Sequence, residues 1–136
     1  VWTGAQARLL RALALSDGRE LARLAFPSPV RLAPVLGPGR VYAAAEDGTI
    51  AAIDRATRAE VWRRRLPARP GGEPTVDGDR LVLGDRSGVV HVLAAATGEP
   101  IRTWTLPAPV TGRIARLGGH YYAPAEDGYV YRIDAP

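Results

Sequence analysis

The carboxylates that could bind a cation are few in this 136-residue chain. The densest pair is Asp77 and Asp79, on either side of Gly78. Ca²⁺ takes about six to eight oxygen ligands, so this pair could supply only part of a site. Asp-Gly-Asp is also typical of a hairpin turn, because Asp hydrogen-bonds to nearby backbone and Gly accepts a positive φ. A structural role is therefore our first interpretation of this pair.

The sequence contains few residues that could act as a nucleophile or bind zinc. The absence of cysteine excludes disulfides, thiolate ligands and a cysteine nucleophile. The two histidines, His91 and His120, are too few for a metal cluster, and no serine has an acid–base partner nearby in sequence. We predict no catalytic residue, no metal ligand and no cofactor-binding residue, and we lean towards a protein that is not an enzyme.

Arginine supplies the strongest charged feature, since all 18 basic residues are Arg and the net charge is +4. Arg63, Arg64 and Arg65, with Arg69, form the densest basic patch. Charges on an outer strand protect its edge from pairing with other chains, and the same patch could contact an acidic partner. The charge is too scattered for a dedicated nucleic-acid binder. No apolar run approaches the roughly 18 residues of a membrane span.

These residues are positioned by a repeat of 40 residues. Eight of the fourteen positions in 41–54 are identical to those in 121–134, and 81–94 falls between them in phase. We divide the chain into copies at 1–40, 41–80, 81–120 and 121–136, within one partial domain that spans 1–136. Apolar residues make up 46% of the chain, enough for such a domain to bury a core.

Each copy is predicted to form strands joined by tight turns. In the second copy, strands at 41–45, 49–54 and 60–66 alternate with turn residues. The connection after Pro67 is predicted to be longer than in the other copies, so that the next strand, near Thr75, starts five residues late. Four strands in about 40 residues are typical of a propeller blade. We therefore predict an all-β fold, a β-propeller with four-stranded antiparallel blades, of which 136 residues hold about 3.4.

The repeated motifs are EDGTIAAIDRATRAEVW at 46–62, RSGVVHVLAAATGEPIRTW at 86–104 and EDGYVYRID at 126–134. This set resembles the quinoprotein-type, or PQQ-like, β-propeller repeat. Two departures are that Thr57-Arg58 lacks the family glycine and that Trp104 lies two positions beyond the slot of Trp62. The residues that carry the signature are Asp47, Gly48, Asp54, Trp62, Gly88, Thr97, Gly98, Trp104, Asp127, Gly128 and Asp134.

The resemblance implies that both tryptophans dock between neighbouring blades, where an indole buries a large area. Enzymes of the family bind pyrroloquinoline quinone with Ca²⁺, and many use a vicinal disulfide, which a chain without cysteine cannot form. Relatives by resemblance also include propellers of outer-membrane barrel assembly and sensor domains of bacterial receptor kinases. Localisation in the periplasm or outside the cell rests on the resemblance alone.

The leading hypothesis is a non-catalytic PQQ-like propeller without a cofactor, whose rim of loops binds a protein, peptide or glycan. Such a chain would belong to a larger bacterial extracytoplasmic or receptor protein. The alternatives are a quinoprotein dehydrogenase fragment that uses pyrroloquinoline quinone and Ca²⁺, and a half-propeller that self-associates. Two chains would give nearly seven blades; otherwise the remaining blades belong to the rest of a longer chain. The candidate surface, with the loop at 68–73, comprises Glu46, Asp47, Arg63, Arg64, Arg65, Arg69, Glu126 and Asp127.

Overall fold

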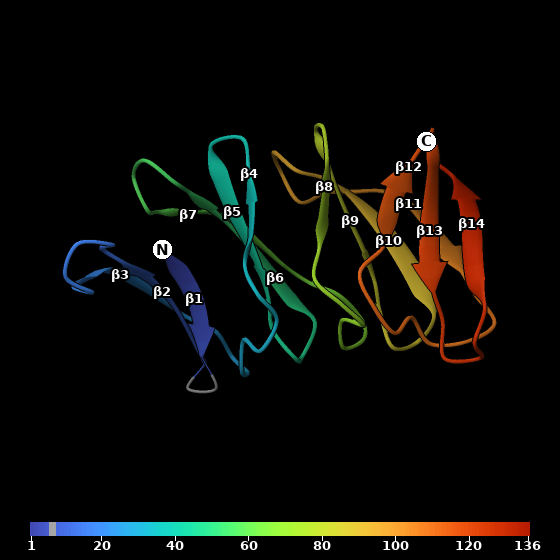
Figure 1. The fold of residues 1–136 in the computed structure, drawn as a ribbon, viewed down its shortest axis with the longest axis horizontal. Helices are drawn as coiled ribbons and strands as arrows, with labels where there is room; N and C mark the ends of the chain where they lie inside the picture. The colour runs from blue at the N-terminus through green and yellow to red at the C-terminus, as the bar shows by residue number, and fades with distance from the viewer. Residues whose placement is uncertain (6–7) are drawn as a thin grey trace.

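The computed structural model describes residues 1–5 and 8–136, which form four antiparallel sheets standing side by side (Figure 1). The N-terminal and C-terminal sheets lie at the two ends of the row (Figure 1). None of the described residues belongs to a helix that could cross a membrane. The strands are β1 (Trp2–Ala5), β2 (Leu9–Leu13), β3 (Glu20–Ala25), β4 (Val35–Gly37), β5 (Arg40–Ala44), β6 (Thr49–Asp54), β7 (Glu60–Arg65), β8 (Thr75–Asp77), β9 (Arg80–Gly84), β10 (Val89–Ala94), β11 (Pro100–Thr105), β12 (Ala115–Leu117), β13 (His120–Pro124) and β14 (Val130–Asp134).

The two middle sheets have four strands each, in the orders β4-β5-β6-β7 and β8-β9-β10-β11. The first sheet, β1-β2-β3, and the last, β12-β13-β14, have three each. Every neighbouring pair of strands is antiparallel. This arrangement confirms the all-β prediction with four-stranded antiparallel blades. We number the sheets as blades 1 to 4 in chain order.

The predicted longer connection after Pro67 is wrong. Strands β4, β8 and β12 begin at residues 35, 75 and 115, in exact steps of 40. The residue equivalent to Val30 and Val110 is Pro70, which forms an isolated bridge to Asp85 just as Val110 does to Ala125. Because Pro70 stands where the other copies have valine, the sequence alignment matched Val30 and Val110 to the later segment near Thr75. Strand β8 pairs with β9 and so opens blade 3 instead of closing blade 2.

The core lies in the gaps between neighbouring blades. Side chains alternate along a strand, so Val41 and Ala43 pack towards blade 1 while Tyr42 and Ala44 pack towards blade 3. A third cluster, which contains Val110 and Tyr121, closes the gap between blades 3 and 4. The middle strands are therefore buried on both faces, which explains their continuous apolar runs.

The hairpin turns follow from Asp-Gly and its variants. The Asp47 Oδ1 atom accepts a hydrogen bond from the Thr49 backbone N–H at 2.9 Å. Gly48 has a φ of +95°, and a Cβ there would lie 2.5 Å from the Leu66 carbonyl oxygen. Only glycine fits that position, because the conformation is left-handed and the backbone of the outer strand passes close by.

Candidate functional site

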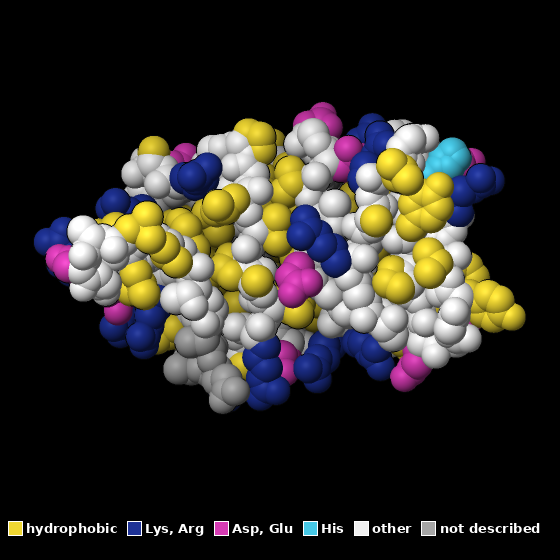
Figure 2. Space-filling model, in the orientation of Figure 1, with side chains coloured by type: hydrophobic (Ala, Val, Ile, Leu, Met, Phe, Trp, Pro, Cys, Tyr) yellow, Lys and Arg dark blue, Asp and Glu magenta, His cyan; other side chains and the backbone are white. Residues whose placement is uncertain are grey.

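Three hairpins and the loops that enter their blades meet at one edge of the sheets, which we call the rim. At each hairpin a backbone N–H donates to a carbonyl of the incoming loop, so the blades present equivalent positions at the same height. These contacts are Glu46 N to Pro29 O at 3.0 Å, Arg86 N to Arg69 O at 2.8 Å and Glu126 N to Pro109 O at 2.9 Å. The rim is the lower edge of the molecule in Figure 2, where dark-blue and magenta side chains lie close together.

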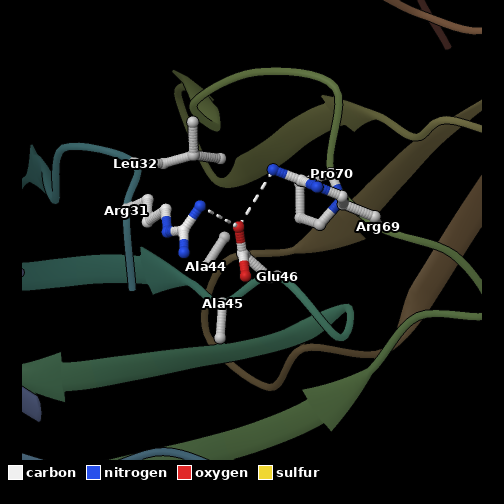
Figure 3. Close-up of a pocket in the computed structure, with 7 residues that line it drawn as sticks. All are labelled: Arg31, Leu32, Ala44, Ala45, Glu46, Arg69 and Pro70. Carbon is white, nitrogen blue, oxygen red and sulfur yellow. Dashed lines mark hydrogen bonds and ion pairs between the residues drawn. The ribbon is translucent and has the colours of Figure 1, made fainter. Parts of the chain in front are cut away.

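Ion pairs on the rim connect neighbouring blades. One oxygen of Glu46 lies 3.0 Å from Arg69 and 3.1 Å from Arg31, and the three side chains converge (Figure 3). Arg86 pairs with Glu126 at 3.4 Å. The structure thus brings together two predicted residues, Glu46 and Arg69, and joins each acidic hairpin to an arginine that the sequence analysis did not single out.

The rim is hollowed beside these pairs. A small pocket of about 50 Å³ lies between Glu46, Leu32 and Pro70 (Figure 3). A wider hollow of about 380 Å³ adjoins it and is lined by Leu32, Arg69, Pro70, Gly71 and Arg86. Two exposed guanidinium groups beside an apolar floor could hold a carboxylate on an apolar segment of a partner.

The two rim aspartates serve their own hairpins. Burial alone would raise the pKa of the Asp47 carboxyl, but hydrogen bonds from Thr49 and Ser28 outweigh it and lower the pKa. Asp127 accepts a hydrogen bond from the Tyr129 backbone N–H at 3.1 Å. Its second oxygen accepts from the Tyr131 hydroxyl, and this bond is the main reason that the pKa of Tyr131 rises to about 12.

The predicted arginine run is divided between different surroundings. Arg63 pairs with Glu60 at 2.6 Å, donates to the Ala25 carbonyl at 2.8 Å and lies 4.7 Å over the ring of Phe26. It therefore fastens blade 2 to blade 1. Arg65 reaches the Asp47 carbonyl at 3.4 Å and so lies at the border of the rim. Arg64, half-buried on the opposite face of β7, joins neither group.

Trp62 lies between blades 2 and 3. Its indole N–H donates to the Ala95 carbonyl at 2.9 Å, and its ring covers Gly98 so closely that a Cβ there would lie 2.5 Å away. Trp104 meets Tyr121 of blade 4 edge to face at 6.4 Å between ring centroids.

The other signature residues lie in or beside turns. Gly48, Gly88, Gly98 and Gly128 all have positive φ. Asp54 accepts backbone hydrogen bonds from Ala56 and Thr57, and Thr97 accepts one from Glu99. Asp134, at the end of β14, lies 3.6 Å from His120.

A buried hydrogen bond between an aspartate and a histidine in blade 3 escaped the sequence analysis. Asp85 Oδ2 lies 2.7 Å from Nε2 of His91, and its Oδ1 accepts hydrogen bonds from the Ser87 hydroxyl at 2.6 Å and the Val89 N–H at 3.0 Å. Burial would raise the pKa of Asp85, but these bonds outweigh it and lower the pKa. Ser87 donates to the carboxylate and not to the imidazole, so this trio does not activate a nucleophile.

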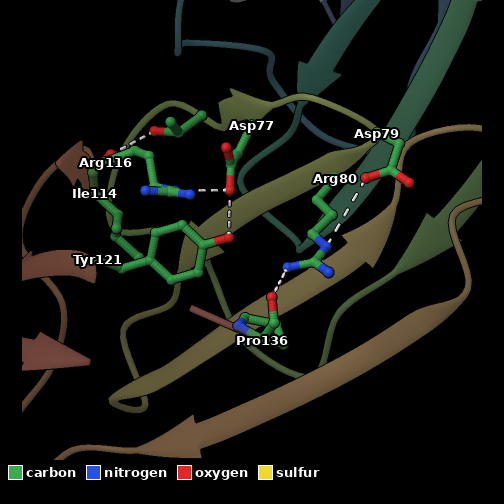
Figure 4. A network of polar contacts seen from close by, with 8 residues as sticks. Asp77, Asp79, Arg80, Ile114, Arg116, Tyr121 and Pro136 are labelled. Atoms are coloured by element: carbon green, nitrogen blue, oxygen red, sulfur yellow. Dashed lines mark hydrogen bonds and ion pairs between the residues drawn. The ribbon is translucent and has the colours of Figure 1, made fainter. Parts of the chain in front are cut away.

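The Asp77–Asp79 pair does not form a cation site. Asp77 accepts hydrogen bonds from Arg116 at 3.0 Å and from the Tyr121 hydroxyl at 2.7 Å (Figure 4). Asp79 is exposed and lies 3.9 Å from Arg80. Within residues 1–5 and 8–136, no three His, Cys, Asp or Glu side chains gather to hold a metal. These carboxylates do not fit the Ca²⁺ that accompanies pyrroloquinoline quinone.

The whole chain matches a known family. The profile of the outer membrane protein assembly factor BamB, a PQQ-like repeat family, covers residues 1–66 and 46–136. The chain belongs to this family. Relatives described by that name come from Marinobacter adhaerens, 42% identical over 67 residues (48% of this chain, 17% of the relative), and Kangiella koreensis, 30% identical over 128 residues (92% and 32%). The chain thus spans a third or less of these relatives.

Solved structures agree on the fold. The crystal structure of BamB from Moraxella catarrhalis superposes with a TM-score of 0.85 over 98% of this chain and 45% of that one, at 20% identity. The computationally designed Ika4 protein gives a TM-score of 0.87 over 99% of this chain and 84% of its own, also at 20% identity. At that identity the likeness establishes the propeller architecture and carries no residue roles.

Proposed function

We propose that this chain forms part of a non-catalytic propeller that binds a protein partner in the periplasm through its rim. The observation that carries the proposal is the row of charged side chains on successive hairpins, Glu46, Arg86 and Glu126. Glu46 pairs with Arg31 at 3.1 Å and with Arg69 at 3.0 Å, and Arg86 pairs with Glu126 at 3.4 Å. Side chains that pair across blades at an exposed edge cost little to re-pair with a partner. Membership of the assembly-factor family supports a protein partner.

The chemistry of the rim suggests what the partner presents. Arg69 and Arg86 flank the hollow over Leu32, Pro70 and Gly71. An extended segment with a carboxylate and an apolar side chain would fit it. Because rim charges set the rate and register of association more than its strength, charge reversal should slow binding and make it less dependent on salt.

The test is photocrosslinking from single positions. The chain carries a photoreactive amino acid in place of Arg69, Arg86 or Glu126, or in place of Arg19 in the turn at the opposite end of the strands. It is added to a detergent extract of bacterial outer membranes, and adducts are identified by mass spectrometry. We expect the three rim positions to capture one component of outer membrane protein assembly, and position 19 to capture none.

A second arm separates charge from location. Arg69→Glu with Arg86→Glu should sharply reduce the adduct formed from position 126 in a short irradiation, while the charge-matched Arg19→Glu with Arg132→Glu should leave it. Equal capture from position 19, or an adduct insensitive to the rim reversal, would refute the proposal.

The propeller ring could be completed in two ways, by a second copy of this chain or by further blades of a longer chain. Two copies that complete nearly seven blades would double the mass seen by light scattering after size exclusion. Completion by further blades of a longer chain predicts a monomer of 14.5 kDa for this segment.

A further inference from the structure

The gap between blades 1 and 2 is built differently from the gap that follows it. Between blades 2 and 3, Trp62 lies against the turn at Gly98. One step of 40 earlier, the same two positions hold Ala22 and Arg58. A Cβ at Gly98 would lie 2.5 Å from the Trp62 ring, so an indole and a side chain on this turn exclude each other. With Arg58 in place, the first gap has lost both its tryptophan and its glycine.

A hollow of about 510 Å³ remains there, which we call the first inter-blade pocket. Apolar side chains of blade 1, among them Trp2, Leu13 and Leu21, form one wall, and Leu36 of β4 lies opposite. Hydrophobic side chains gather over this part of the molecule at the left of Figure 2. The volume falls within the roughly 300 to 1,000 Å³ of small-molecule sites.

Positive charge gathers at the blade 2 side of the pocket. Arg55 and Arg58 both line it. The ion pairs found within residues 1–5 and 8–136 involve other arginines, so neither of these two has an acidic partner there. An apolar wall that faces two guanidinium groups is complementary to a molecule with an apolar body and an anionic end.

The backbone at Arg58 supports a role beyond folding. Its φ is +62°, in the left-handed region that Gly18 and Gly98 occupy at the equivalent positions. A non-glycine residue there costs about 1 to 2 kcal/mol, and such strain concentrates where a side chain is needed for function. Arg8, with a φ of +62° but outside the pocket, offers a matched comparison.

We propose that the first inter-blade pocket binds a small aromatic carboxylate. The ring packs against Trp2, Leu13 and Leu21, and the carboxylate faces Arg55 and Arg58. The site lies between β-sheet faces and the turn at 55–58, apart from the rim, so it can be occupied independently of a protein partner there.

The experiment uses indole-3-propionate and its neutral amide as probes, with binding measured by isothermal titration calorimetry on the whole chain. We expect the acid to bind at least tenfold more tightly than the amide. Arg58→Gly and Arg55→Gln should each weaken the acid several-fold and the amide little. Arg8→Gly removes the same charge and relieves the same left-handed backbone, yet should leave both affinities unchanged.

A filling variant provides an independent readout. Ala22→Trp with Arg58→Gly rebuilds the Trp62–Gly98 pair in the first gap, and it should abolish binding while the thermal midpoint rises. If that variant does not fold, the comparison of Arg58→Gly with Arg8→Gly still decides. No binding of the acid, equal binding of acid and amide, or equal loss in Arg8→Gly and Arg58→Gly would overturn the proposal.

Discussion

The packing of Trp62 in the gap between blades 2 and 3 can be tested by adding a single methyl group at Gly98. Gly98→Ala places a Cβ at a φ of +76°, and its nearest neighbours would be Trp62 ring atoms at 2.5 to 2.9 Å. Gly18 occupies the equivalent turn of blade 1 with a φ of +74°, but nothing lies within 4 Å of a Cβ there. Gly18→Ala is therefore a control that carries the backbone cost without the collision.

The magnitude has two parts. The left-handed conformation costs an alanine about 1 to 2 kcal/mol in both variants. In Gly98→Ala the indole must also move, which breaks its hydrogen bond to Ala95, worth about 1 kcal/mol, and uncovers part of its ring. Complete removal of a buried tryptophan side chain costs about 3 to 5 kcal/mol, which limits this second part. We expect a loss of about 2 to 4 kcal/mol for Gly98→Ala and about 1 to 2 kcal/mol for Gly18→Ala.

Urea unfolding followed by far-ultraviolet circular dichroism measures both losses, with the slope m reporting whether unfolding stays two-state. Combining Gly98→Ala with Trp62→Ala completes a double-mutant cycle. Without the indole, Gly98→Ala should cost no more than Gly18→Ala. The reasoning fails if the two glycine variants are equally stable, or if the extra cost of Gly98→Ala persists when Trp62 is absent.

Two further predictions concern buried polar contacts. Asp85→Ala should cost about 2 to 4 kcal/mol in urea unfolding, because it leaves His91 and three other donors without the carboxylate. Asp85→Ala with His91→Ala should recover part of that loss. A single variant no less stable than the double would contradict this. Tyr121→Phe should cost about 1 kcal/mol. The folded state lowers the pKa of Asp77 and of Asp85, so both carboxylates stabilise the fold above the unfolded Asp pKa of about 3.9. This stability is lost as the pH falls through the folded pKa values. In the variant without Asp85 and His91, the urea midpoint should therefore fall less steeply as the pH is lowered.

The period and the turns could be predicted because they depend on local chemistry. Asp47 with Gly48 specifies a hairpin wherever it occurs, and its return at 127–128 sets the step of 40. The placement of Trp62 between blades comes instead from the resemblance to the PQQ-like repeat, and it agrees with the large area that an indole buries there. The entry of blade 3 was misplaced because Pro70 hid the valine pattern, although its backbone occupies the same position.

What the sequence could not provide were contacts between segments far apart in the chain. Arg63 and Arg69 look alike in a basic run, but one stacks on Phe26 of the preceding blade and the other pairs with Glu46 on the rim. Asp85 and His91 are six residues apart on a hairpin. Their contact could not be predicted from the sequence, because it depends on both side chains being buried on the same side of the sheet. Arg86 had a usable signal, since it stands one step of 40 from both Glu46 and Glu126.

The rim and the gaps between blades are mechanically linked, because the ion pairs of Glu46 with Arg69 and of Glu126 with Arg86 connect neighbouring blades. Arg69 is attached to blade 3 through the carbonyl that accepts from Arg86, and it reaches across to Glu46 of blade 2. The spacing of these charges is therefore set by the packing between the two sheets, which Trp62 and Gly98 determine. A partner that contacts several rim charges at once binds best when the spacing between those charges is fixed. Loosening the gap should then weaken rim binding even when every rim residue is intact.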